Sequence, residues 1–362
     1  MVILGSSGSI GVNALNIARR FNLEVEALSV NGNIELLNEQ IAEFKPRFVA
    51  IGDDSKKHLV NHDKVFVGVD GILEMIELAH SKKVVNALVG FAGLKPTLKA
   101  LELNKDLSLA NKESLVIAGK FIDCSRIIPI DSEHFGLWYL LNEKTPKKLY
   151  ITASGGAFRD WDISKIANAK LADALKHPNW AMGQKITIDS ASMVNKLFEL
   201  LEARWLFNTT NIDAVIERGS IVHAMVEFID GTTTAQLSGT DMKLPIAYAM
   251  IDKVTEPILE PLDLLKLNAI KFEEIKEDRY PIWQIKEHLL NNPDMGVVLN
   301  AVNEAAIEGF IKEKYGFFGM VDKILKAYRH FEGVKPASID ELFEIDKEVR
   351  EFIKPKLFNR NF

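Results

Sequence analysis

The chain opens with MVILGSSGSIG, residues 1–11, which reads as a short β-strand running directly into a glycine-rich loop. Apolar residues at helical spacing follow the loop, at Val12, Leu15, Ile17 and Phe21. EVEALSV at 24–30 then reads as a second strand. Strand and helix patterns go on alternating through residue 123. This order predicts an α/β protein whose N-terminal part is a Rossmann-like, doubly wound parallel sheet.

Composition limits the class of protein. With 362 residues, of which 47% are hydrophobic and 26% charged, the chain is long enough for roughly two or three domains. A net charge of −6 argues against a nucleic acid or an anionic membrane as the main partner. The single cysteine, Cys124, excludes an intramolecular disulfide and fits a cytoplasmic location. We also expect no membrane segment and no signal peptide, because no apolar run approaches the ~18–20 residues that cross a bilayer.

The pattern changes from residue 150. Residues 186–207 predict a strand followed by a long helix, and residues 214–239 predict antiparallel strands joined by an Asp-Gly turn. We therefore expect an α+β second domain and then a C-terminal helical bundle. The predicted boundaries are 1–130 for the nucleotide-binding domain, 131–254 for the α+β domain, 255–282 for a linker and 283–362 for the bundle.

The first loop has the composition of a nucleotide site. Gly5, Gly8 and Gly11 stand three residues apart between a strand and a helix, whose N-terminus suits a pyrophosphate. A glycine turn without a ligand is the alternative. The second strand ends in LSVNGN, 28–33, without the acidic residue that binds the ribose 2′-hydroxyl of NAD. This favours NADP, although no lysine or arginine is visible at that tip to bind the 2′-phosphate.

A pair of acids follows the alternating region, in IPIDSEHFGLWYLL at 128–141. On an extended segment Asp131 and Glu133 would share one face, and two hard carboxylates suit Mg²⁺ or Mn²⁺. Solvated acids in a loop are the alternative reading. A metal site needs a third oxygen, and Glu199, on the predicted helix after ITIDSAS, is the candidate.

That helix also carries donors for a phosphate. Asn195 and Lys196 share a face with Glu199, Ser190 precedes the helix, and Ser192 could cap it. The alternative is the wet face of an amphipathic helix. Three loops could complete a site: ASGGAFRDW at 153–161 with Ser154, HPNWAMG at 177–183 as a lid that carries Trp180, and LANKESL at 109–115 at the end of a strand.

Six motifs in this order resemble the 1-deoxy-D-xylulose 5-phosphate reductoisomerase family over nearly the whole chain: GSSGSIG, ANKESLV, DSEH, SGGAFR, HPNWAMGQKITIDSASMVNK and EARWLF. The resemblance implies an NADPH domain, a catalytic domain that also forms a homodimer, a linker and a helical bundle. It implies metal-dependent rearrangement and NADPH reduction of 1-deoxy-D-xylulose 5-phosphate to 2-C-methyl-D-erythritol 4-phosphate, in non-mevalonate isoprenoid precursor synthesis. A retro-aldol/aldol route and a direct 1,2-shift both stay open.

The resemblance also assigns residues. One divalent cation, Mg²⁺, Mn²⁺ or Co²⁺, would be bound by Asp131, Glu133 and Glu199. The sugar phosphate would be bound by Lys112, Ser132, Glu133, Ser154, His177, Trp180, Ser190, Asn195, Lys196 and Glu199. NADPH would be contacted by Ser7, Gly8, Ser9, Ile10, Asn31, Gly32, Asn33, Asn111, Glu113 and Gly183. Lys112 and the three metal ligands would form the catalytic set.

Three positions depart from the family pattern: Ser7 replaces threonine, Gly32 replaces a basic residue, and Ala157 replaces proline. The change at Gly32 weakens the expected preference for NADPH unless another group binds the 2′-phosphate. Two other functions are compatible with parts of this pattern. One is a metal-independent NAD(P) dehydrogenase of the amino-acid-semialdehyde type, which needs no carboxylate trio. The other is a nucleotide-binding regulatory protein without catalysis.

Overall fold

The computed structural model describes residues 1–141, 144–267 and 269–356, and their fold divides into two compact units. The first unit comprises Met1–Ser114, Asp123–Phe135 and Asp241–Pro261. The second comprises Leu115–Ile122, Gly136–Thr240 and the described chain from Leu262 onward. The four-part division predicted from the sequence remains a prediction, and its last six residues lie outside the described residues.

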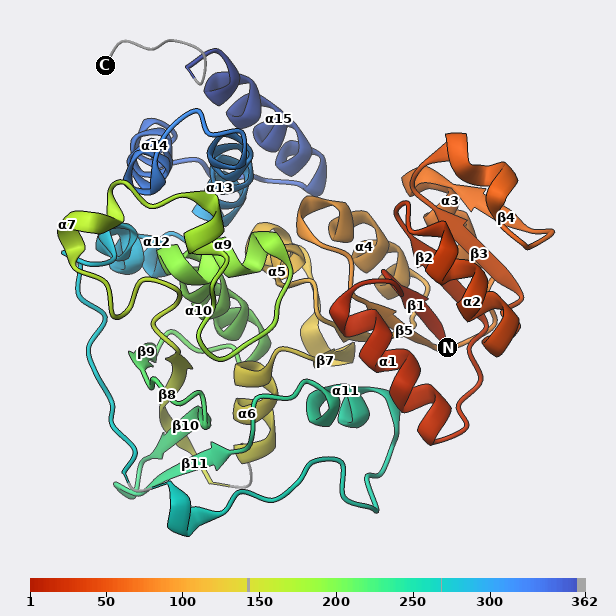
Figure 1. The fold of residues 1–362 in the computed structure, drawn as a ribbon, viewed down its shortest axis with the longest axis horizontal. Helices are drawn as coiled ribbons and strands as arrows, with labels where there is room; N and C mark the ends of the chain where they lie inside the picture. The colour runs from red at the N-terminus through yellow and green to blue at the C-terminus, as the bar shows by residue number, and fades with distance from the viewer. Residues whose placement is uncertain (142–143, 268, 357–362) are drawn as a thin grey trace. The chain divides into compact units, whose positions relative to one another are not determined.

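The first unit is built on a seven-stranded parallel sheet with the strand order β4-β3-β2-β1-β5-β6-β7 (Figure 1). Its strands are β1 (Val2–Leu4), β2 (Ala27–Val30), β3 (Phe48–Ile51), β4 (Val65–Val67), β5 (Lys83–Asn86), β6 (Asp106–Leu109) and β7 (Ile127–Pro129). The chain runs outward from β1 to β4 and then returns to place β5 on the other side of β1. The loops after β1 and β5 therefore meet at the topological switch point, where such sheets bind ligands.

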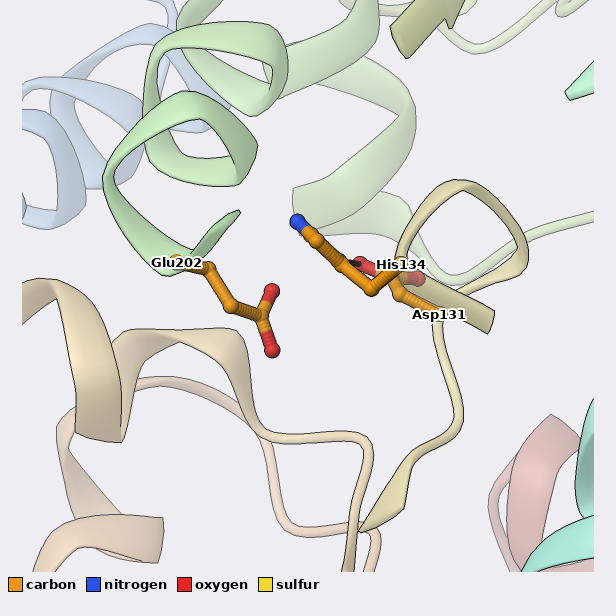
Figure 2. A group of neighbouring side chains, drawn as sticks. All are labelled: Asp131, His134 and Glu202. Carbon is orange, nitrogen blue, oxygen red and sulfur yellow. Dashed lines mark ion pairs between the residues drawn. The ribbon is translucent and has the colours of Figure 1, made fainter. Parts of the chain in front are cut away.

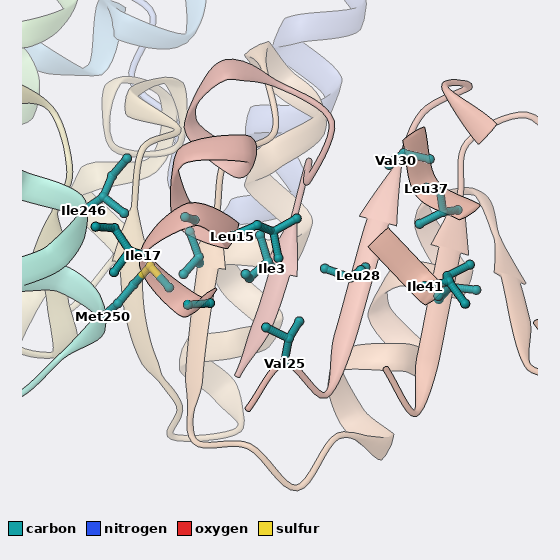
Figure 3. Packing of buried hydrophobic residues seen from close by; sticks show 14 of the residues in the cluster. Ile3, Leu15, Ile17, Val25, Leu28, Val30, Leu37, Ile41, Ile246 and Met250 are labelled. Atoms are coloured by element: carbon teal, nitrogen blue, oxygen red, sulfur yellow. The ribbon is translucent and has the colours of Figure 1, made fainter. Parts of the chain in front are cut away.

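Helices cover both faces of this sheet, which is why its strands read as short apolar runs rather than alternating ones. They are α1 (Ser9–Arg20), α2 (Ile34–Phe44), α3 (Gly68–Leu78), α4 (Leu94–Glu102), the start of α5 (Lys112–Ala118) and α11 (Lys243–Met250). On one face α1, α2 and α11 bury a continuous apolar core against the strands (Figure 3). Helix α11 lies beside α1, and its Ile246 and Met250 belong to the same core as Ile3 and Ile17.

The second unit contains a four-stranded mixed sheet with the order β11-β10-β8-β9. Its strands are β8 (Pro146–Ala153), β9 (Ile212–Ile216), β10 (Val222–Phe228) and β11 (Thr233–Leu237). The predicted antiparallel hairpin with an Asp-Gly turn is confirmed for β10 and β11, where Gly231 has φ +83°. The prediction is wrong for β9, which pairs parallel with β8, because the connection between these two strands is a long helical crossover.

That crossover contains α7 (Ile163–Ile166), α8 (Leu171–Ala174), α9 (Gln184–Ser192) and α10 (Val194–Leu206). The predicted strand at ITIDSAS is wrong, since these residues form most of α9. The β-branched Ile186, Thr187 and Ile188 suggested a strand, but tertiary contacts override that propensity. An ion pair of 2.8 Å between Lys185 and Asp189, at helical i,i+4 spacing, stabilises the helical form.

The C-terminal helical bundle is confirmed in the described residues. It contains α12 (Lys286–Asn291), α13 (Gly296–Ile311), α14 (Phe317–His330) and α15 (Ile339–Lys356). Helix α13 is buried on nearly all sides and packs against α14 and α15. The remaining helix is α6 (Ser132–Leu140), and short 3₁₀ turns are η1 (Asp54–Leu59), η2 (Gly90–Gly93), η3 (Gly119–Phe121), η4 (Cys124–Arg126), η5 (Leu264–Lys266), η6 (Pro281–Ile285) and η7 (Pro293–Met295). Across the described residues, no helix is both long and apolar enough to pass through a bilayer.

Candidate functional site

The loop between β1 and α1 has the backbone geometry of a pyrophosphate cradle. Gly5 has φ +80°, and a Cβ there would lie 2.6 Å from the carbonyl oxygen of Ala87, so glycine allows this loop to contact the loop after β5. A Cβ on Gly11 would lie 2.2 Å from the Gly5 oxygen, so glycine also allows α1 to pack closely on the turn. Gly8 precedes α1 and no side chain caps the helix there. The N–H groups of its first turn are thus available to an anion.

The serines of this loop have different roles. Ser6 is fully buried, and its hydroxyl donates to Gln40 Oε1 at 2.7 Å, which ties the loop to α2. Ser7 and Ser9 are more exposed, as is Gly8 between them, and Ile10 is partly buried in the first turn of α1. The exposed part of the loop is therefore the part assigned to the cofactor from the sequence.

Two other predicted cofactor residues, Asn33 and Asn111, use their side chains to hydrogen-bond the backbone near the ends of the strands. Asn33 precedes α2, and its side chain accepts from Leu36 N at 3.3 Å, which makes it a helix cap. Asn111 is fully buried and donates to the carbonyl oxygens of Leu88 and Gly90, both at 2.9 Å. Asn111 therefore fixes the loop after β5 at the switch point. Glu113 is also buried, and its Oε2 accepts from Asn111 Nδ2 at 3.2 Å.

The first two predicted metal ligands lie at the start of α6. Their expected extended conformation is wrong: Asp131 directly precedes the helix, its carbonyl oxygen accepts from Phe135 N at 2.8 Å, and Glu133 lies in the first helical turn. Strand β7 ends at Pro129, so the chain has already left the sheet. Lys112 is buried and forms an ion pair with Asp131, and Ser132 Oγ donates to Glu133 Oε2 at 2.7 Å.

The third ligand and the phosphate donors lie on α10. Glu199 is 1% exposed; it accepts from Asn195 Nδ2 at 2.5 Å and forms an ion pair with Lys196. Lys196 is also buried, and its Nζ donates to the Thr152 carbonyl oxygen on β8 at 2.5 Å. Ser192 is not the N-cap residue of α10, but its Oγ accepts from the N–H of Val194, the first residue of that helix, at 3.4 Å. Ser190 and Ser192 belong to α9, and α10 begins after Met193, whose φ of +71° turns the chain from one helix into the next.

The three predicted carboxylates converge. One oxygen each from Asp131, Glu133 and Glu199 lies within 4.8 Å of the others, which is the hard, all-oxygen donor set that Mg²⁺ and Mn²⁺ prefer. A second group shares Asp131 and adds His134 and Glu202 (Figure 2). His134 Nδ1 lies 4.0 Å from Asp131 Oδ2, and both added residues are almost fully buried.

Ser154 and His177 form a hydrogen-bonded pair. His177 Nδ1 accepts from the backbone N–H groups of Asn179 and Trp180, at 3.2 and 2.9 Å. The proton is therefore on Nε2, which donates to Ser154 Oγ at 2.8 Å. Burial, with a smaller contribution from the nearby positive charge of Arg159, lowers the pKa of His177 to about 4, so the ring is neutral near pH 7.

The loop of Ser154 lies tightly against α9. Gly156 has φ +69°, and a Cβ there would lie 2.7 Å from the Ser190 carbonyl oxygen. The Tyr280 hydroxyl donates to the Gly155 carbonyl oxygen at 2.8 Å on the other side. Close packing at Gly156 thus places the loop that contains Ser154 against the backbone of α9 at Ser190.

The 177–183 segment has no regular secondary structure. Asn179 Nδ2 donates to Arg218 O and Ser220 Oγ, both at 2.7 Å, and the Trp180 ring meets the His223 ring edge to face at 6.1 Å. Trp180 is thus partly buried rather than inserted into the core. Gly183 is exposed directly before α9. A lid role for this segment remains a prediction.

His134 and Glu202 were not assigned roles from the sequence, although both lie in motifs quoted above. The usable signal for Glu202 was its position three residues after Glu199 on one helix, which places both acids on neighbouring faces. No equivalent signal existed for His134, since a histidine in an apolar segment is commonly a core residue.

Comparison with known proteins identifies the family. Three family models match: 1-deoxy-D-xylulose 5-phosphate reductoisomerase over residues 1–119, the C-terminal domain of the same enzyme over 127–207, and the DXP reductoisomerase C-terminal domain over 237–352. The chain belongs to the 1-deoxy-D-xylulose 5-phosphate reductoisomerase family. The resemblance drawn from the six motifs is confirmed.

Relatives in the reductoisomerase family match along nearly their whole length. The reductoisomerase of Nautilia profundicola is 57% identical over 360 residues, covering 97% of this chain and 98% of that protein. That of Campylobacter hominis is 55% identical over 358 residues, covering 99% of each. Family membership does not favour the metal-independent dehydrogenase considered above.

Solved reductoisomerase structures share the fold. A crystal structure of DOX-P reductoisomerase in complex with NADPH, fosmidomycin and magnesium has a TM-score of 0.90 at 33% identity, covering 98% of this chain and 97% of that one. The Zymomonas mobilis enzyme in complex with NADPH has a TM-score of 0.89 at 30% identity, covering 99% and 98%. The predicted fold class is confirmed.

Proposed function

We propose that this chain converts 1-deoxy-D-xylulose 5-phosphate into 2-C-methyl-D-erythritol 4-phosphate, with a divalent cation and NADPH, as a step of isoprenoid precursor synthesis. The observation that carries the proposal is the convergence of Asp131, Glu133 and Glu199 in a member of the reductoisomerase family. An aldehyde reduction alone would need no such donor set, whereas a rearrangement of a hydroxyketone does need an electrophile at its oxygens.

The residues present fit one hard cation. Asp131, Glu133 and Glu199 would bind it through carboxylate oxygens, and it would supply Lewis acidity at the ketone and the adjacent hydroxyl of the substrate. Lys112, which forms an ion pair with Asp131, orients that carboxylate. Ser132 fixes Glu133 in the same way by donating to its Oε2.

The phosphate of the substrate would be bound by residues of the second unit. Asn195 and Lys196 project from one turn of α10, and Gly156 holds the Ser154 loop against Ser190. Neutral His177 donates from Nε2 toward Ser154 Oγ, which orients that hydroxyl. Binding energy gained at the phosphate, remote from the reacting carbons, positions the carbon skeleton for rearrangement. Trp180 and its loop would exclude water from the reacting atoms.

The first unit would bind the cofactor, and the residues present fit a dinucleotide. The cradle formed by Gly5, Gly8 and Gly11 takes the pyrophosphate at the start of α1. Ser7 and Ser9 add hydroxyl donors at the exposed part of the loop. Bound NADPH supplies the hydride that reduces the rearranged aldehyde.

A homodimer is the assembly that we propose. Strand β11 is an edge of the second sheet, whereas the opposite edge, β9, is partly covered through the bridge from Ile216 to Glu273. Leu237 on β11, and Trp138 and Tyr139 on α6, are 37%, 42% and 54% exposed. An open edge beside exposed large apolar residues is typical of an interface between subunits.

We also propose a cytoplasmic location, which rests on the single cysteine.

The function is tested by oxidation of NADPH in the presence of 1-deoxy-D-xylulose 5-phosphate, with and without Mg²⁺, after treatment with a chelator. The proposal predicts turnover that depends on both the sugar phosphate and the metal, and formation of 2-C-methyl-D-erythritol 4-phosphate. Turnover that survives the chelator, or no turnover with this substrate, would contradict it.

A further inference from the structure

The tip of β2 lacks a charged side chain of its own. Residues 31–33 are Asn31, Gly32 and Asn33, and the side chain of Asn33 caps α2. In this fold the end of the second strand is the place that distinguishes a ribose 2′-hydroxyl from a 2′-phosphate. A 2′-phosphate bound here needs a positive charge from somewhere else.

The neighbouring strand brings a lysine to this tip. Strand β3 pairs with β2 (Figure 1), and the N–H groups of Gly52 and Asp53 donate to the Asn31 carbonyl oxygen at 2.9 and 3.1 Å. The 3₁₀ turn η1 follows directly, and Lys56 Nζ on this turn donates to the Gly32 carbonyl oxygen at 3.1 Å. The Lys56 ammonium thus lies against the backbone of the residue where a basic side chain is missing.

The ammonium of Lys56 lies close to the position that a side chain on residue 32 would take. A Cβ on Gly32 would lie 3.1 Å from Lys56 Nζ, closer than nearly all Cβ contacts. A side chain at position 32 would therefore require this ammonium to shift slightly from its observed position. With glycine at position 32, the ammonium of Lys56 lies against the tip of β2 without having to shift.

The charge of Lys56 is also available to a ligand. Its side chain is 42% exposed, and an ammonium has three donors, of which one is used on Gly32. Its ion pair with Asp53 is long, at 3.6 Å, and the Asp53 carboxylate is held by the N–H and hydroxyl of Ser55, at 3.2 and 2.6 Å. A dianionic phosphate would compete well with this single, solvated carboxylate.

We propose that Lys56 is the residue that recognises the 2′-phosphate of NADPH in this chain, in place of a basic side chain at position 32. Asp53 weakens that recognition by competing for the same ammonium. The inference rests on the proposed function for its cofactor, but it concerns a binding step that is measured without turnover.

Calorimetric binding of 2′,5′-ADP and of 5′-ADP tests the proposal directly. Lys56→Ala is expected to weaken 2′,5′-ADP about tenfold and to leave 5′-ADP unchanged, because one charge-assisted contact to the extra phosphate is lost. Lys57→Ala, a neighbouring exposed lysine on the same turn, is the matched control and should change neither. Equal affinities of wild type and Lys56→Ala for 2′,5′-ADP, or an equal loss in Lys57→Ala, would overturn the proposal.

Two further variants sharpen the result. Gly32→Lys should restore 2′,5′-ADP binding in the Lys56→Ala background, and Asp53→Asn should tighten it in the wild-type background. Failure of both would contradict the assigned roles. Turnover of wild type at saturating NADPH is recorded separately: its absence alongside the expected binding pattern would reject the enzyme function while leaving the role of Lys56 intact.

Discussion

At the scale of single residues, His177 shows how the backbone selects a tautomer. Two N–H groups of its own loop donate to Nδ1, which leaves the Nε2 proton for Ser154. Burial lowers the pKa of His177 to about 4 from its usual 6.5. Between these values the unfolded chain binds a proton that the folded chain does not, so folding stability decreases as pH falls through this window.

His177→Gln is therefore expected to make the thermal midpoint less sensitive to pH between 6.5 and about 4. Glutamine does not titrate, so the variant can no longer take up the proton that His177 binds when the chain unfolds. The matched control is His58→Gln, at an exposed histidine on η1, measured by calorimetry over the same pH range. Identical pH dependence in His177→Gln and wild type would show that His177 is not held neutral.

Residue types in the sequence were enough to make Asp131, Glu133 and Glu199 candidates, because three hard donors near a phosphate-binding pattern suggest a cation, and the family resemblance then assigned them together. Lys56 could not be found this way. Its role depends on the pairing of β2 with β3, which brings together residues 32 and 56, and no local pattern records that pairing.

At the scale of elements, the contact of the Ser154 loop with α9 depends on one glycine. An alanine at Gly156 would have to adopt φ near +69° and place its Cβ 2.7 Å from the Ser190 oxygen. We expect Gly156→Ala to lower the free energy of unfolding by about 1–2 kcal/mol from the backbone conformation alone, and to raise KM for the phosphorylated substrate. Denaturant unfolding and steady-state kinetics measure the two effects.

Gly239→Ala is the control for this prediction, since a Cβ there meets no atom within 4 Å and its φ is not positive. If both variants behaved alike, the close approach at Gly156 would have no role.

The helices and strands were not all equally predictable from the sequence. The alternating first 120 or so residues followed from periodicity, but α9 did not, because its β-branched residues favour a strand until Lys185, Asp189 and Asn303 fix it as a helix.

At the scale of the whole molecule, the open edge at β11 predicts self-association. Light scattering after size exclusion should give a mass of twice the 40.6 kDa chain. Leu237→Lys should shift this mass toward the monomer by placing a charge on the exposed edge, whereas Leu265→Lys, at a residue that is 96% exposed outside that edge, should not. A monomeric wild type would contradict the proposed assembly, which the sequence suggested only through family resemblance.

A Mn²⁺ titration, followed by electron paramagnetic resonance, of wild type and two matched variants tests whether Asp131, Glu133 and Glu199 bind the cation. Glu199 and Glu202 lie on one helix, are both about 1% exposed, and belong to different groups that share Asp131. We expect one bound ion per chain in wild type, its loss in Glu199→Gln and its retention in Glu202→Gln. An ion that is still bound in Glu199→Gln would show that Glu199 is not a metal ligand.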